Sequence, residues 1–235
     1  MNSNRVRLLF ICIFTSSLLT YGQDNLVSYD LKKGEVFDIL FLTTREGTQD
    51  LFKEYRQTAF PVASEMSFSP LPGFKIREIV QGDYEPQSLI LAKWTSLALR
   101  EKFLDEIEGR VPNFHEMRKK IWPLFNLTYY EIQDDHAIQL DRKKVIIATA
   151  YWKKENMQGN FTSFLTQWKK ALKKTNGTLK IELVNGRSPK GYVYNPDYMA
   201  ITQWETKADF EAFQKESLKM DTDFLKKINQ FRLTD

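Results

Sequence analysis

The chain has 235 residues, of which 42% are hydrophobic, 27% charged and 14% aromatic. This composition is typical of a globular protein and excludes intrinsic disorder, collagen-like repeats and a polytopic membrane fold. The formal net charge is only +4, with 34 basic and 30 acidic residues spread along the chain. We therefore expect neither a nucleic-acid partner nor an anionic-membrane partner.

Residues 1–22 have the layout of a cleaved secretory signal peptide. Arg5 and Arg7 precede a short apolar stretch at 8–14, and small residues stand before a cut after Gly22. A membrane anchor is the alternative, but the stretch is shorter than the roughly 20 residues that span a bilayer. We expect a secreted or periplasmic bacterial protein that has no membrane attachment after cleavage.

Cys12 is the single cysteine of the chain. A lipid anchor on Cys12 is disfavoured because bulky residues, Phe10 and Ile11, precede it. Cleavage of the signal would remove Cys12 and leave a chain with no disulfide, no thiolate nucleophile and no cysteine metal site. The stability of the mature chain must then come from packing.

The two halves of the chain share a pattern of aromatic residues at a constant offset of 110 positions. The matched residues are Tyr84, Pro86, Trp94, Phe103 and Phe114 in the first half and Tyr194, Pro196, Trp204, Phe213 and Phe224 in the second. Chance similarity between two aromatic-rich segments is the alternative, and we favour tandem duplication. The predicted organisation is an N-terminal extension at 23–33, one repeat at 34–132, a charged linker at 133–144 and a second repeat at 145–235.

Hydrophobic periodicity predicts the elements of the first repeat. The strands are expected at 36–42, 74–80, 88–94 and 125–132. One helix is expected to begin at Thr48, a second at Leu97, and a short third helix after Pro112. Pro61 is expected to end or kink the first helix.

The second repeat has the same predicted order. Strands are expected at 145–152, 178–184, 198–204 and 230–234. A helix with an apolar stripe from Phe161 to Leu172 is expected to stop at Asn176 and Gly177. Another helix begins at Thr206, and Asp209 three residues later forms a pair that is similar to a capping box.

This order of strands and helices is the ferredoxin-like βαββαβ unit, whose sheet has one face without helices. Two such units in one chain can cover these bare faces by packing sheet to sheet. The predicted fold is therefore α+β, with two tandem ferredoxin-like units packed as an intrachain α/β barrel. We expect a monomer whose halves form an internal pseudo-dimer.

The sequence resembles the dimeric α/β-barrel superfamily at Gly82-Asp83-Tyr84-Glu85-Pro86, the strand 89–94, and a helix with Arg100 and Phe103. It is most similar to small bacterial barrel domains of undefined function and to antibiotic-biosynthesis-type monooxygenases, and the superfamily also includes the ethyl-tert-butyl-ether-degradation-type proteins. Tyr194-Asn195-Pro196 matches the pattern less well. The resemblance covers most of 34–235 and implies the barrel fold. Because members include cofactor-independent oxygenases, haem-binding enzymes and proteins with no shown activity, it implies no single reaction.

Two histidines lie in the mature chain. His115 is a candidate base or axial haem ligand because imidazole titrates near neutrality and binds metals. A solvent-facing helix position is the alternative for His115, and we favour it. His136 follows two aspartates, but adjacent ligands in a linker rarely converge on one ion, so no metal site is expected.

Five aromatic or basic residues are candidate ligand contacts: Arg77, Tyr84, Trp94, Tyr194 and Trp204. The two tyrosines enter the third strand of each repeat, where they could donate hydrogen bonds and stack on a ring; packing across a turn is the favoured alternative. The two tryptophans could line a cavity, although core packing is more common. Arg77 could pair with an anionic substrate if it faces the barrel interior, and is solvated if it faces outward.

The mature sequence has no glycine-rich phosphate loop, serine elbow, paired-histidine helix or cysteine cluster, which disfavours the familiar hydrolase and nucleotide-binding classes. The preferred interpretation is an exported protein that binds a small apolar or aromatic molecule, with no assignable reaction and no cofactor. The first alternative is a cofactor-independent or haem-using monooxygenase-like enzyme, with His115, Tyr84 or Tyr194 as the proton-handling group. The second alternative is a protein-interaction module.

Overall fold

The computed structural model describes residues 25–189 and 191–234. The first repeat contains β2 (Val36–Thr43), α1 (Gln49–Glu65), β3 (Ser69–Gln81), β4 (Ser88–Trp94), α2 (Leu97–Arg110), α3 (Phe114–Ile121) and β5 (Leu124–Glu131). The second contains β7 (Val145–Lys153), α4 (Gln158–Lys174), β8 (Thr178–Val184), β9 (Tyr198–Trp204), α5 (Lys207–Ser217) and β10 (Leu225–Thr234). The expected signal peptide at 1–22, with Cys12, lies outside the described residues.

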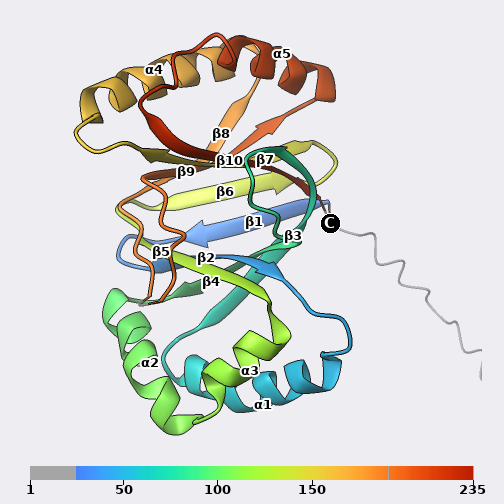
Figure 1. The fold of residues 1–235 in the computed structure, drawn as a ribbon, viewed down its shortest axis with the longest axis vertical. Helices are drawn as coiled ribbons and strands as arrows, with labels where there is room; N and C mark the ends of the chain where they lie inside the picture. Colours follow the sequence, from blue (N-terminus) through green and yellow to red (C-terminus); the bar gives the residue numbers. More distant parts are fainter. Residues whose placement is uncertain (1–24, 190, 235) are drawn as a thin grey trace, which may run out of the picture.

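Each repeat forms one ferredoxin-like sheet. The strand order is β5-β2-β4-β3 in the first repeat and β10-β7-β9-β8 in the second, and β3 pairs with β10 to join them. At the opposite edges, Tyr129 and Arg187 exchange two backbone hydrogen bonds, with N–O distances of 2.8 and 2.9 Å. Helices α1 to α3 cover the outer face of one sheet and α4 and α5 the outer face of the other (Figure 1). The predicted α+β fold of two ferredoxin-like units packed sheet to sheet is confirmed.

The interior between the sheets is filled by apolar side chains from both repeats. Because side chains alternate along a strand, Phe37, Ile39 and Phe41 of β2 face this interior, while Val36 and Leu42 face the helices. The second repeat contributes a matching set that includes Ile146, Ala148, Ala150, Met199 and Ile201. Burial of this shared cluster holds the two repeats together.

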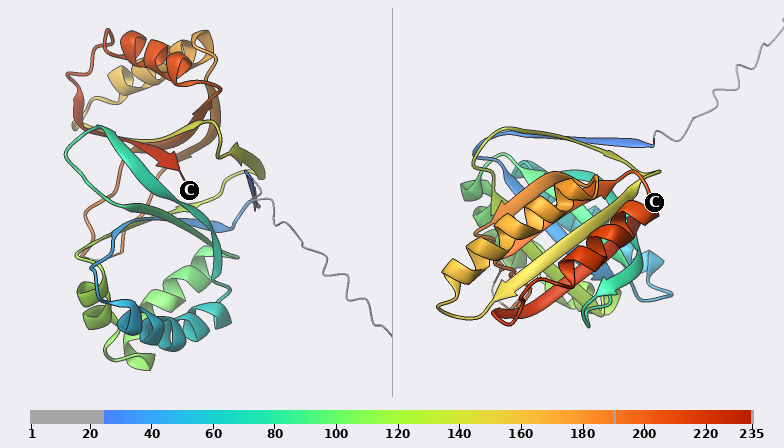
Figure 2. Two further views of the ribbon diagram at one scale, coloured as in Figure 1. Left: turned by 90° about the vertical axis from the view of Figure 1, so that its right-hand side faces the viewer. Right: turned by 90° about the horizontal axis from the view of Figure 1, so that it is seen from above.

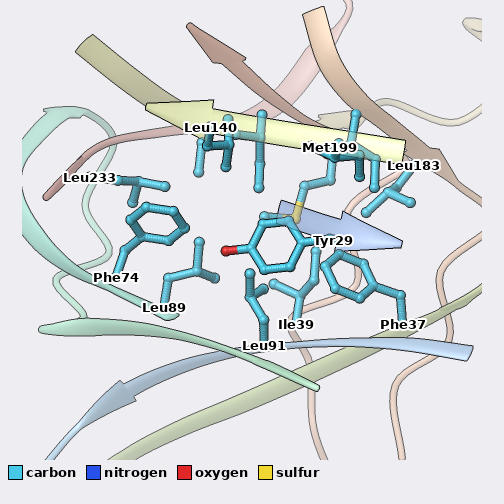
Figure 3. Packing of buried hydrophobic residues seen from close by; sticks show 14 of the residues in the cluster. Tyr29, Phe37, Ile39, Phe74, Leu89, Leu91, Leu140, Leu183, Met199 and Leu233 are labelled. Carbon is cyan, nitrogen blue, oxygen red and sulfur yellow. The ribbon is translucent and has the colours of Figure 1, made fainter. Parts of the chain in front are cut away.

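A two-stranded ribbon that sequence periodicity did not predict completes the interior. Strands β1 (Leu26–Leu31) and β6 (His136–Asp141) pair antiparallel and lie between the two halves (Figures 1 and 2). Tyr29 of β1 stands in the centre of the interior cluster, near Leu140 of β6 and Met199 (Figure 3). The Tyr29 hydroxyl donates a 2.7 Å hydrogen bond to the carbonyl of Pro72. The ribbon therefore closes one side of the barrel core.

Two local expectations need correction. The segment 133–144, expected to be a solvated linker, contains β6, in which Ile138 and Leu140 are buried. Of the two outcomes expected at Pro61, an end or a kink of the helix, the end is wrong, because α1 continues to Glu65. Proline has no N–H, so Pro61 leaves the carbonyl of Gln57, four residues earlier, without its helical hydrogen bond. Both residues lie on the exposed side of α1, where water can donate to that carbonyl. Across residues 25–189 and 191–234, no helix is long and apolar enough to cross a bilayer.

Candidate functional site

A cavity of about 260 Å³ lies in the first repeat, between the sheet and its helices. Strands β2, β4 and β5 form its floor, and helices α1, α2 and α3 form its other walls. Most of the lining is apolar or aromatic, and includes Leu40, Leu42, Phe52, Tyr55, Ala59, Phe60, Ala63, Ile90, Trp94, Phe103, Phe114, Trp122, Phe125 and Leu127. Concave apolar sites with a few placed polar groups are the usual binding sites for small molecules.

Small residues on α1 create much of this space. Ala59 and Ala63 stand one turn apart on the buried face of the helix, and both line the cavity. Their methyl groups leave open a volume that longer side chains would occupy. Phe52 and Phe60 line the cavity and also border a hollow on the outer face of α1, so these rings stand between the cavity and the surface.

A buried ion pair lies on the cavity wall. Asp38 of β2 accepts hydrogen bonds from Nε of Arg100, 3.0 Å from each carboxylate oxygen, and from the indole N–H of Trp94 at 3.0 Å. The side chains of Asp38 and Arg100 are 4% and 2% exposed. Burial raises the pKa of the Asp38 carboxyl above its usual value, and the charge of Arg100 opposes this rise. The signal for this site in the sequence is an aspartate inside an apolar strand, a signal absent from the candidate residues above.

Arg118 of α3 is a second buried cation on the same wall. The residue is 6% exposed, and its guanidinium lies over the rings of Phe125 and Phe114, 3.6 and 4.9 Å from their centroids. Within the described part of the chain, no hydrogen bond or ion pair reaches this guanidinium, and its Nε is fully buried. Burial lowers the pKa of Arg118. Nothing in the sequence pattern distinguished Arg118 from its neighbours Lys119 and Lys120.

The two candidate tyrosines meet in the barrel interior. The ring centroids of Tyr84 and Tyr194 are 4.8 Å apart, and both rings contact Phe41. The Tyr84 hydroxyl accepts a hydrogen bond from the Asn126 amide, and the Tyr194 hydroxyl accepts one from Asn229 at 3.3 Å. Burial raises the pKa of Tyr84 to about 12, so its phenol stays protonated at neutral pH. The structure thus packs these tyrosines against each other, away from the first-repeat cavity.

The candidate tryptophans and Arg77 lie in different environments. Trp94 lines the cavity, whereas Trp204 is buried between β9 and α5, with its ring 4.9 Å from that of Phe210. Arg77 is exposed on β3. Among the five candidate ligand contacts, the structure therefore places only Trp94 on this cavity.

Neither histidine lines the cavity. His115 has a 42% exposed side chain, and its Nε2 is 2.9 Å from a carboxylate oxygen of Glu108. His136 begins β6 in the ribbon. The cavity therefore lacks the imidazole that a histidine-ligated haem needs, and such a haem does not fit it. In the described chain, no group of three or more histidine, cysteine, aspartate or glutamate side chains could hold a metal ion.

Comparison with known proteins finds similarity in structure alone. No protein-family model and no curated protein matches the sequence. A chlorite dismutase mutant from Candidatus Nitrospira defluvii superposes with a TM-score of 0.50 at 8% identity, over 87% of this chain and 93% of the other. An anthrone oxidase-like protein has a TM-score of 0.46 at 14% identity, over 88% and 95% of the two chains.

The similarity to the chlorite dismutase extends over both repeats, because it covers 87% of this chain. Identity of 8% supports a shared fold and says nothing of a shared reaction. Together with the two ferredoxin-like strand orders, this similarity shows that the chain has the fold of a tandem α/β barrel, in which two ferredoxin-like units pack sheet to sheet.

Proposed function

We propose that this protein binds a small, largely apolar molecule in the first-repeat cavity between the sheet and helices α1 to α3. The observation that carries the proposal is the cavity itself, about 260 Å³ in volume and lined mainly by aromatic and aliphatic side chains. An apolar cavity of about 150 Å³ already accommodates benzene. The available space suits a ligand of one ring or a medium-length alkyl chain.

The proposed site lies outside the barrel interior. The interior between the two sheets is occupied by the shared cluster around Tyr29, Phe41 and Phe231. Space for a ligand lies on the other face of the first sheet, where Ala59 and Ala63 leave it open. The proposed binding face is therefore the helix-covered face of the first repeat.

Binding is better supported than catalysis. The cavity has no histidine, and its single carboxylate, Asp38, is held by Arg100 and Trp94. A general base must reach a substrate proton, and a carboxylate already engaged by a guanidinium and an indole is poorly placed for this. We propose in addition that the protein acts after export as a monomer, which N-terminal sequencing of secreted protein and analytical ultracentrifugation would test.

A neutral probe with one ring tests the binding site. Isothermal titration calorimetry with toluene as the probe should show saturable binding of one probe per chain. Ala59→Phe places a ring inside the cavity and should weaken probe binding at least about tenfold, a loss of about 1.4 kcal/mol. Thr58→Phe adds the same ring on the exposed side of α1 and should leave probe binding unchanged.

Circular dichroism and cooperative thermal unfolding must show that both variants are folded. Equal probe binding by the wild-type chain and a folded Ala59→Phe variant would contradict the proposal, as would the absence of saturable binding by the wild-type chain. Native mass spectrometry of the purified protein provides a second readout, because a retained ligand would appear as a mass that Ala59→Phe loses.

A further inference from the structure

This inference rests on the proposed function and names the class of ligand. We propose that the first-repeat cavity is selective for an apolar monocarboxylate, whose carboxylate group is bound by Arg118 with help from Arg100. The apolar part of the ligand would lie between the helices and the sheet, against Ala59 and Ala63.

The charges on the cavity wall do not balance. Arg100 and Arg118 carry two positive charges, and Asp38 is the single acidic residue that lines the cavity. With Asp38 ionised, one positive charge remains without a counter-ion; with Asp38 protonated, the excess is larger. A buried charge without a partner is costly, so an anion that enters this cavity gains an attraction that bulk water does not provide.

The hydrogen-bonding groups point to the same conclusion. Nη1 of Arg100 and Nε of Arg118 are buried, and neither has a hydrogen-bond partner in the described chain. The aromatic rings around Arg118 stabilise its charge but do not accept its N–H groups as an oxygen does. A carboxylate matches the planar fork of a guanidinium and would satisfy such donors.

The second repeat shows that the fold does not need these charges. In the first repeat, Val36 pairs with Trp94, and Asp38 lies two residues after Val36. In the second repeat, Val145 pairs with Trp204 in the same way, and the residue two positions after Val145 is Ile147. Arg100 follows Trp94 by six residues, and the residue six positions after Trp204 is Phe210. Ile147 and Phe210 are 0% and 4% exposed, so the second repeat fills the same places with apolar side chains.

Arg118 has no equivalent helix in the second repeat. It lies on α3, between α2 and β5, whereas the described chain between α5 and β10 contains no helix. The first repeat therefore carries an additional element that brings a cation to the cavity. The second repeat has the same fold without these charged residues. Charged residues that the fold does not need, and that line a cavity, are typical of a binding site rather than of a hydrophobic core.

The excess of one positive charge favours a monoanion. A phosphate monoester, which carries close to two negative charges at neutral pH, would exchange a positive imbalance for a negative one. The volume of about 260 Å³ limits the apolar part to a single ring or a medium-length chain. Octanoate is a suitable test ligand, and 1-octanol is its neutral counterpart of the same length.

Isothermal titration calorimetry at pH 7.5 compares the binding of octanoate, 1-octanol and octyl phosphate to the full mature chain. We expect octanoate to bind about tenfold more tightly than 1-octanol, because charge-assisted hydrogen bonds favour the anion. Arg118→Met keeps an unbranched side chain and should remove this preference while leaving 1-octanol affinity within about twofold. Arg56→Met is the control, since Arg56 also lies over aromatic rings but is exposed on α1, and it should keep the preference.

The outcomes separate this inference from the proposed function. If 1-octanol and octanoate bind with equal affinity, selectivity for the anion is wrong while binding in the cavity stands. If the probe itself does not bind, the proposed function fails and this inference fails with it. Tighter binding of octyl phosphate than of octanoate would overturn the monocarboxylate assignment. Should Arg118→Met not fold, the wild-type comparison still decides, and Arg118→Lys should retain the preference because it retains the charge.

Discussion

The buried pair of Asp38 and Arg100 allows a quantitative test of the structure. Arg100→Phe removes the guanidinium and leaves the Asp38 carboxylate, which is 4% exposed, with the indole N–H of Trp94 as its remaining side-chain partner. Loss of one member of a buried ion pair costs about 3–5 kcal/mol, because the other charge stays buried without compensation. We expect the free energy of unfolding to fall by about this amount at pH 7.

The second repeat supplies the compensating variant. Asp38→Ile with Arg100→Phe introduces the buried apolar residues that occupy the equivalent positions of the second repeat, Ile147 and Phe210. Replacing a buried ion pair by apolar residues of similar volume is often neutral or stabilising, so the double variant should recover most of the loss, to within about 1 kcal/mol of the wild-type value. Urea unfolding followed by circular dichroism measures all four proteins of this cycle.

The loss caused by Arg100→Phe should depend on pH. Burial already raises the pKa of Asp38, and removing Arg100, which opposes that rise, raises it further. Between the unfolded value of about 3.9 and the higher folded value, the folded state binds more protons than the unfolded state. The free energy of unfolding of the variant therefore falls as pH rises through this window. The difference in this free energy between the wild-type chain and Arg100→Phe should be largest near neutral pH and should shrink toward pH 4.

Arg110→Met is the matched control on the same helix. Arg110 is 38% exposed and pairs with Glu65 at 2.7 Å, and exposed ion pairs contribute little to stability. If Arg100→Phe costs no more than Arg110→Met, or if its cost does not decrease on acidification, the description of Asp38 and Arg100 as a buried, mutually dependent pair is wrong.

Further predictions concern packing and titration. Gly177→Ala should destabilise the fold by about 1–3 kcal/mol in thermal unfolding, because the added Cβ would lie 2.3 Å from a side-chain atom of Leu172. Gly109→Ala is the control: its added Cβ has no atom within 4 Å, and it should raise stability by about 0.5–1 kcal/mol. Leu140→Ala, at a residue 0% exposed in the ribbon, should cost about 2–5 kcal/mol in urea unfolding, and a near-zero cost would show that the ribbon does not contribute to the core. Partial burial lowers the pKa of His115, so stability should decrease as pH falls below the unfolded histidine value of about 6.5. NMR titration of the imidazole measures this, and a raised pKa would contradict it.

Local features of the fold were readable from the sequence. Strand ranges such as Tyr198–Trp204 follow from apolar runs in the sequence. The pair Thr206 and Asp209 predicted the start of α5, and the Thr206 hydroxyl does accept a 3.1 Å hydrogen bond from the Asp209 N–H. The repeated order of these elements was enough to predict two ferredoxin-like units. These signals depend on residues a few positions apart, which is why a sequence alone reveals them.

The ribbon and the site were decided by contacts between distant residues. Strand β1 pairs with β6 more than a hundred residues later, and the charges around β6 hid its short alternation of Ile138 and Leu140. The cavity exists because Ala59 on one helix, Arg118 on another and Asp38 on a strand converge on one space. The elements and their duplication are thus encoded in local patterns of residues. The position of the cavity and the charges that face it emerge only on folding, because both depend on side-chain volumes and directions contributed by several elements.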